Sequence, residues 1–193
     1  MQNCFHRTIK YRYPALDWRL MEEKRTDAFT VSRGLIVTII IFLTVSDQLT
    51  KLWTQRVFFL GEGRTVIPGF FDLRYIQNTG AAWGIFSGFN HWLVVFSFIM
   101  LALLIRFRHH LIGHHPLERI SLALMLSGII GNLIDRVRLG YVVDFLDFYI
   151  GSRHFPAFNI ADAAITGGVA LYFIAQLILS RSRSSENSQG TGI

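Results

Sequence analysis

Four apolar runs, each approaching the length of a membrane span, set the pattern of the chain. They extend from about Gly34 to Trp53, Asn90 to Ile105, Ile120 to Leu139 and Asn159 to Leu179, and few charged residues interrupt them. A bilayer core about 30 Å thick requires about 20 helical residues. The pattern therefore predicts an all-α integral membrane protein with four transmembrane helices.

The segments between the apolar runs differ in charge. Seven Lys and Arg residues lie in 1–33, three lie in 106–119, and the tail carries Arg181 and Arg183. By the positive-inside rule, both termini and the middle loop are expected in the cytoplasm. The segments 54–89 and 140–158 are then expected on the outer side of the membrane.

The connecting segments also suggest how the chain is divided. The stretch RTVIPGFFDLRYIQN alternates apolar and polar residues around Gly and Pro, which predicts short strands and a small extracytoplasmic β platform. We expect 34–180 to form the four-span domain, between a disordered cytoplasmic extension at 1–33 and a polar, disordered cytoplasmic tail at 181–193. Met21 lies shortly before the first run, and we expect either that Met21 is the true start or that the segment preceding it is dispensable.

Composition supports a membrane protein and argues against other classes. Hydrophobic residues make up 51% of the chain and charged residues 17%, which is unusual for a soluble fold. The net charge of +6 suggests nucleic-acid binding at first, but the cations flank the apolar runs and so indicate topology. One cysteine, Cys4, offers neither a disulfide nor a zinc site. Four histidines in the predicted cytoplasmic loop lie opposite the polar cluster described next, so we expect no metal and no other cofactor.

Ionisable residues cluster toward the outer ends of the predicted helices, where Asp47, Lys51, Asp135, Arg136 and Asp162 all fall. Such groups are costly in a membrane, so each is a candidate functional residue. Structural interpretations remain open for each of them. Asp47 and Lys51 have the i, i+4 spacing of an ion pair. Asn132, Asp135 and Arg136 share one helix face, with Gly128 one turn earlier allowing a close helix approach.

The carboxylates near the fourth run have ordinary interpretations too. In FPAFNIAD, Asn159 could cap the helix and Asp162 could bond back from its third position. Asp144 and Asp147 in VVDFLDF could be loop carboxylates near water. Because they alternate with large apolar residues, we expect at least one of them to point inward.

Five short blocks in order resemble the blocks of the signal peptidase II family. They are DQLTK, NTGAAWGIF, SGIIGNLIDR, VVDFLDF and FNIADAAI, and the resemblance covers about residues 35–180. Each block is weak alone, but five in order on a four-span frame are specific. The resemblance implies a bacterial plasma-membrane aspartic endopeptidase that cleaves signal peptides from diacylglyceryl-modified prolipoproteins, just before the lipid-bearing Cys. It also implies membrane lipid as a partner; no nucleic acid is expected, and we expect a monomer.

Matching the blocks residue by residue carries the family's roles onto this chain. The catalytic pair falls on Asp144 and Asp162. The substrate-binding or positioning residues fall on Asp47, Lys51, Asn78, Gly128, Asn132, Asp135, Arg136 and Asn159. Trp83 replaces the usual Phe, Ser127 replaces the usual Gly, and the N-terminal extension is longer than usual. The first two departures affect the expected pocket shape but not the chemistry.

Two carboxylates that share one proton are suited to activate water, since close like charges cannot both ionise cheaply. Which one carries the proton does not follow from the sequence. The outer aromatic residues Trp53, Phe58, Phe59, Phe70, Phe71, Trp83 and Phe86 could hold peptide and lipid. An ion-coupled transporter or a non-enzymatic membrane protein would also carry intramembrane charges. The absence of inverted repeats disfavours the transporter, and the set of outer Asn and Asp residues disfavours the non-enzymatic protein.

Overall fold

The computed structural model describes residues 31–80, 88–111, 113 and 115–190. The chain divides into two units, Met1–Thr30 and Val31–Ile193. All of the first unit lies outside the described residues, so the expectation for the N-terminal extension is not addressed by the structure.

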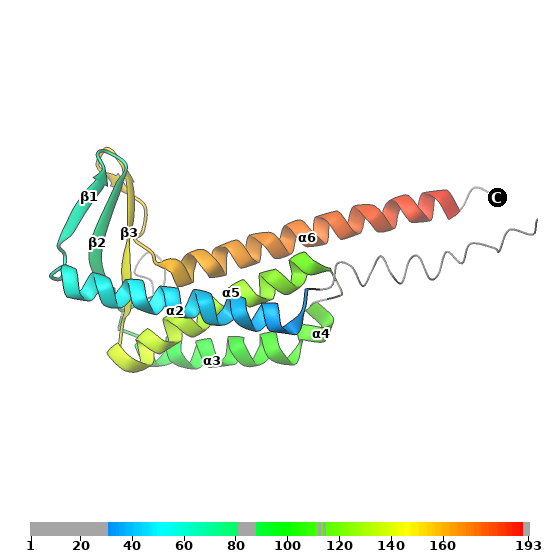
Figure 1. Ribbon diagram of the computed structural model, residues 1–193, viewed down its shortest axis with the longest axis horizontal. Coiled ribbons are helices and arrows are strands. Elements are labelled where there is room, and N and C mark those ends of the chain that lie inside the picture. The colour runs from blue at the N-terminus through cyan, green and yellow to red at the C-terminus, as the bar shows by residue number, and fades with distance from the viewer. Residues whose placement is uncertain (1–30, 81–87, 112, 114, 191–193) are drawn as a thin grey trace, which may run out of the picture. The chain divides into compact units, whose positions relative to one another are not determined.

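Five helices account for most of the described residues (Figure 1). They are α2 (Arg33–Val57), α3 (Asn90–Arg106), α4 (Arg108–Leu111), α5 (Pro116–Leu139) and α6 (Ile160–Gly190). Within the described part of the chain, α2, α5 and the stretch Ile160–Arg181 of α6 are long and apolar enough to cross a membrane. Helix α3 is apolar but has only 17 residues. Three of the four predicted spans are therefore long enough to cross a membrane, and the fourth, α3, is shorter.

Local sequence signals set the helix ends. The Ser32 hydroxyl caps α2 by accepting a hydrogen bond from the Leu35 backbone N–H. Pro116 begins α5, where its missing N–H has no intrahelical partner to lose. Gly140 ends α5 in the left-handed conformation, with φ of 83°, which glycine adopts without strain.

A four-stranded sheet in the order β1-β2-β3-β4 stands at one end of the helices (Figure 1). Its strands are β1 (Gly63–Ile67), β2 (Phe71–Asn78), β3 (Val142–Ile150) and β4 (Arg153–His154), and all pairs are antiparallel. The strands predicted in the first outer segment are thus confirmed. The second outer segment supplies β3 and β4, which the sequence did not indicate, and β3 brings VVDFLDF beside β2.

Helix α5 contacts α2, α3 and α6 and lies at the centre of the helical part. Two glycines permit this packing on the α6 side. A Cβ atom at Gly128 would collide with the Ala161 carbonyl oxygen, and one at Gly131 would lie 2.6 Å from the Asp47 carboxylate. The small residues therefore let three helix backbones approach closely where the polar side chains meet.

The C-terminal helix runs further than the sequence indicates. Helix α6 continues to Gly190, into the polar tail for which composition indicates disorder. No proline interrupts residues 181–190, and the first glycine comes at position 190. A helix already started by an apolar span can extend through such residues, because propagation is much easier than nucleation.

Candidate active site

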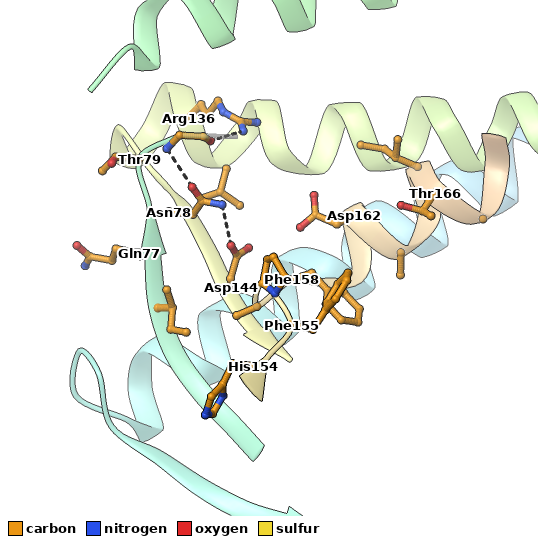
Figure 2. A pocket seen from close by; sticks show the side chains of 18 residues that line it. Gln77, Asn78, Thr79, Arg136, Asp144, His154, Phe155, Phe158, Asp162 and Thr166 are labelled. Atoms are coloured by element: carbon orange, nitrogen blue, oxygen red, sulfur yellow. Dashed lines mark hydrogen bonds between the residues drawn. The ribbon is translucent and has the colours of Figure 1, made fainter. Parts of the chain in front are cut away.

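Two carboxylates reach the same space from different elements. Asp144 comes from β3 and is 2% exposed, and Asp162 comes from the first turn of α6 (Figure 2). In the β2–β3 register Asp144 faces Ile76, which brings Asn78 of the same strand into diagonal reach of its side chain. The loop before α6 then folds back along β3, where Phe158 pairs with Leu146.

Three asparagines hold these carboxylates. The Asn78 side chain donates to Asp144 Oδ2 at 3.0 Å, and Asn159 Nδ2 donates to Asp144 Oδ1 at 2.8 Å. Asn132 Nδ2 donates to Asp162 Oδ1 at 2.7 Å. Each acidic side chain is thus oriented by amide donors from neighbouring elements.

Asp162 also takes part in the helix cap suggested by its sequence position. Its backbone N–H donates to Asn159 Oδ1 at 2.9 Å, while its Oδ2 accepts from the Asn159 backbone N–H at 3.3 Å. This reciprocal pair is a capping box. The cap and the position at the pocket coexist, so the structural interpretation of Asp162 holds without excluding a chemical role.

The pKa of Asp144 is raised to about 7. Burial is the main cause, because a carboxylate removed from water favours its neutral form, and the negative charge of Asp162 adds to it. Hydrogen bonds from Asn78 and Asn159 and the positive charge of Lys51 oppose the rise. Near neutral pH this carboxyl group is therefore poised to hold or release a proton.

A buried charge network lies beneath the two carboxylates. Lys51 is fully buried, and its Nζ lies 2.8 Å from Asp47 Oδ2 and 3.0 Å from Asp135 Oδ2. The same ammonium donates to Asn132 Oδ1 at 3.0 Å, which leaves the Asn132 amide nitrogen facing Asp162. Lys51 thereby fixes the orientation of the side chain that contacts one of the two carboxylates.

The network also joins the helices to the sheet. Asp47 Oδ1 accepts from the Ala161 backbone N–H at 2.9 Å, and Asp135 Oδ2 accepts from the Val143 backbone N–H at 3.1 Å. Gln48 Nε2 donates to both acids and to the Gly131 carbonyl. These bonds connect α2 and α5 to the residues directly before Asp144 and Asp162.

Both carboxylates line a pocket of about 840 Å³. Its wall is mainly apolar, with Phe155, Phe158 and Val142 among the lining residues, and Thr166 comes from the next turn of α6 (Figure 2). This size and character are typical of small-molecule and peptide sites. Within the described ranges, no cluster of three or more His, Cys, Asp or Glu side chains is arranged to hold a metal ion.

The residues expected at the site divide into two groups in the structure. Asn78 and Arg136 line the pocket together with Asp144 and Asp162, and Arg136 donates to the Gly80 carbonyl at 3.3 Å. The remaining six lie behind its wall: Asp47, Lys51, Gly128, Asn132, Asp135 and Asn159. Two aromatic residues expected near the site, Trp83 and Phe86, lie outside the described residues.

Asp147, three residues after Asp144, has a separate environment. It is buried, and it lies 2.9 Å from His154 Nδ1 and 3.9 Å from an Arg74 nitrogen. The expectation that at least one of the two acids points inward is confirmed for both. The alternative of loop carboxylates near water is wrong, because β3 pairs with β2 and covers them.

Several pocket residues had no signal in the sequence. His154 and Gln77 line the pocket, but neither falls in a spacing pattern. Gln48 was detectable in principle, because it lies between Asp47 and Lys51 in DQLTK. Its reach to both acids depends on the packing of α2 against α5, which local sequence does not reveal.

The family model for signal peptidase (SPase) II matches residues 39–178. The chain belongs to the signal peptidase II family. Lipoprotein signal peptidases from Geobacter metallireducens and Desulforapulum autotrophicum are 43% and 44% identical to it. The first alignment covers 74% of this chain and 90% of the relative, and the second covers 72% and 86%.

The fold also resembles a solved structure described as a bacterial membrane enzyme. That structure superposes with a TM-score of 0.72 at 37% identity, and the match covers 77% of this chain and 90% of the solved chain. All five motif blocks lie within the span that the signal peptidase II model matches, so the family resemblance seen in the sequence is confirmed.

Proposed function

We propose that this chain is an aspartic endopeptidase that cleaves the signal peptide from diacylglyceryl-modified prolipoproteins, with Asp144 and Asp162 as its catalytic pair. The observation that carries the proposal is that two carboxylates from separate elements share one pocket, with the pKa of Asp144 near neutral. Membership of the signal peptidase II family and relatives named lipoprotein signal peptidase support the substrate class.

In the proposed mechanism the pair shares one proton. Asp144 holds it and hydrogen-bonds to the scissile carbonyl oxygen, while ionised Asp162 takes a proton from water as the water oxygen attacks the carbonyl carbon. The proton then passes to the departing amine as the C–N bond breaks. The effect of the Asp162 charge on the pKa of Asp144 supports this division of roles.

The surrounding side chains would position the pair and the peptide. Asn78 and Asn159 fix the two oxygens of Asp144, and Asn132 fixes one oxygen of Asp162. Arg136 lines the pocket and could orient a peptide carbonyl or a lipid ester through its remaining N–H groups. The buried Lys51, Asp47 and Asp135 would act through Asn132 and the backbone, and Gly128 through the closeness of α5 and α6.

The location of the site suits a lipid-bearing peptide. Asp162 lies in the first turn of the candidate α6 span, which supports a pocket at the level of a membrane surface. Its apolar wall could hold the signal peptide and part of the diacylglyceryl group. We propose that the signal helix enters from the bilayer.

We further propose that the protein is monomeric in the bacterial plasma membrane, with four spans, both termini in the cytoplasm and the site on the outer face. Helix α3 has 17 residues, or about 26 Å of helix, and packs against α5, which supports a fourth span. The distribution of Lys and Arg supports the orientation. The proposed peptidase domain is 34–180, between the cytoplasmic segments 1–33 and 181–193.

Cleavage by the purified full chain tests the proposed function. The substrate is a prolipoprotein with diacylglyceryl-modified Cys, and the control is the same precursor with Ser in place of that Cys, which cannot be lipidated. We expect the first alone to yield a product whose N-terminus is the lipidated Cys, identified by mass spectrometry. A folded, reconstituted protein that leaves both precursors intact would refute the proposal, and ion flux in the same vesicles would favour the transporter.

A further inference from the structure

A second pocket lies at the opposite end of the helices from the sheet. It has a volume of about 510 Å³ and is formed by residues from α2, α4 and α5. Figure 1 shows the start of α2 and α4 at this end of the molecule. Thirteen residues of α5 separate Arg119 at this pocket from Asn132, or about 20 Å of helix. The pocket is therefore remote from the candidate active site.

The polar side chains that line this second pocket are mainly cationic. They are those of Arg33, Arg108 and Arg119, with His109 beside them. Among the residues that the structure describes, none of these arginines forms an ion pair with a carboxylate. The nearby Glu118 is buried and accepts from the Gly113 backbone and the Gln176 side chain. The positive charge of the three arginines is thus available to an anion.

The arginines are also held in place. Arg119 donates to the Val31 carbonyl oxygen at 3.0 Å, and Arg108 donates to the Ile105 carbonyl oxygen at 2.9 Å. A guanidinium has five N–H groups, so each retains donors for a ligand. Arg33 stands in the first turn of α2, where the positive end of the helix dipole adds to its charge. Planar guanidinium groups suit the oxygens of a phosphate.

The rest of the wall is apolar and comes from Ile36, Val37 and Leu122. Ile36 and Val37 lie among the first five residues of one candidate membrane span, and Leu122 lies in the second turn of another. A phosphate anion bound among the arginines would therefore have hydrocarbon-compatible surface directly beside it. This combination favours a phosphate attached to a lipid over a free phosphate ion.

We propose that this pocket binds the phosphodiester headgroup of an anionic phospholipid, with the upper part of its acyl chains against the apolar wall. On the topology proposed above, the lipid belongs to the cytoplasmic leaflet. The site is separate from the catalytic pair, and its occupancy does not depend on the proposed protease activity.

Native mass spectrometry of the full chain released from nanodiscs tests the proposal. One set of nanodiscs holds phosphatidylcholine alone, and the other holds equal amounts of phosphatidylcholine and phosphatidylglycerol. We expect one phosphatidylglycerol to be retained in preference to phosphatidylcholine. The variant combining Arg33→Gln with Arg108→Gln should lose at least about tenfold of that preference, since each cation near the headgroup contributes roughly fivefold.

Matched controls keep the result interpretable. Arg181→Gln removes an exposed cation at the end of the α6 span without touching the pocket, and it should retain the lipid. Arg119→Lys keeps the charge but loses the planar fork, so we expect an intermediate preference from it. All variants should cleave prolipoprotein normally in phosphatidylcholine, which verifies folding.

Three results would overturn the proposal. Equal loss of lipid in Arg181→Gln and the double variant would indicate general attraction to a cationic surface. Displacement of phosphatidylglycerol by inorganic phosphate at equal concentration would identify a free-phosphate site. Retention of the preference by the double variant would contradict the assignment to these arginines.

Discussion

Asp162 has two roles in this structure that substitution by Asn can separate. Its Oδ2 accepts the capping bond from the Asn159 backbone N–H, and its Oδ1 accepts a separate bond from the Asn132 side chain. In Asp162→Asn the remaining side-chain oxygen can still accept one of these two hydrogen bonds. The new NH₂ group then faces the other donor and cannot accept from it. Losing one such bond costs about 1–2 kcal/mol of stability. Since the oxygen that remains keeps part of the cap, the protein should still fold and insert.

The catalytic role predicts a larger effect on rate. Asn cannot take a proton from water, so either Asp162→Asn or Asp144→Asn should lower cleavage per folded molecule by roughly 10² to 10⁴. Even the lower limit equals about 2.7 kcal/mol in the barrier. Because groups that act as a unit lose most of their effect at the first substitution, the double variant should be little worse than either single variant.

The assay is precursor cleavage in vesicles at matched amounts of folded protein, followed by gel mobility, with thermal unfolding measured in parallel. Asp147→Asn is the control, since this acid is as buried as Asp144 but bonds to His154 instead of an asparagine. We expect it to keep substantial activity. Retention of more than about a tenth of normal cleavage by either single variant would refute the catalytic assignment.

Three further predictions concern protonation, the buried network and topology. Because the pKa of Asp144 is raised to about 7, its proton is lost as the pH rises through that value, and kcat/KM should decline above pH 7. A kcat/KM that stays constant up to pH 9 would contradict a shared proton. Lys51→Met leaves Asp47 and Asp135 without their cation, so it should lower the free energy of unfolding in mixed micelles by about 3–5 kcal/mol. The control Arg56→Met, at an exposed position of α2, should change that free energy by no more than about 0.5 kcal/mol. Alkaline phosphatase fused after Ser180 should be inactive, and strong activity of that fusion would overturn the cytoplasmic C-terminus.

The sequence predicts the helical part well because each span carries its own signal. Apolar length fixes α2, α5 and most of α6, and caps such as Ser32 and Gly140 are visible as residue types at helix ends. The ion pair of Asp47 with Lys51 follows from spacing alone. Short-range patterns therefore suffice for elements whose hydrogen bonds are local.

The sheet and the contacts around it depend on partners distant in the sequence. Strand β3 is buried along most of its length, and the two acids of VVDFLDF stand three residues apart among apolar residues, so the segment lacks the strict period-two alternation that marks a half-exposed strand. The contact of Asn78 with Asp144 depends on the β2–β3 register, which includes an irregularity between Leu73 and Ile76. The motif blocks identify both residues, but only the folded chain shows that one orients the other.

The bridge from Lys51 to Asp135 also has a consequence for biogenesis. Asp47 and Lys51 can neutralise one another within α2 while that helix enters the bilayer, but the contact with Asp135 forms only after α5 has been inserted as well. Until α5 packs against α2, the Asp135 carboxylate lies at membrane depth without the Lys51 ammonium to compensate its charge. Substitutions in the first span should thus be detected by quality-control proteases, as reduced amounts of inserted chain, before any effect on turnover can be measured.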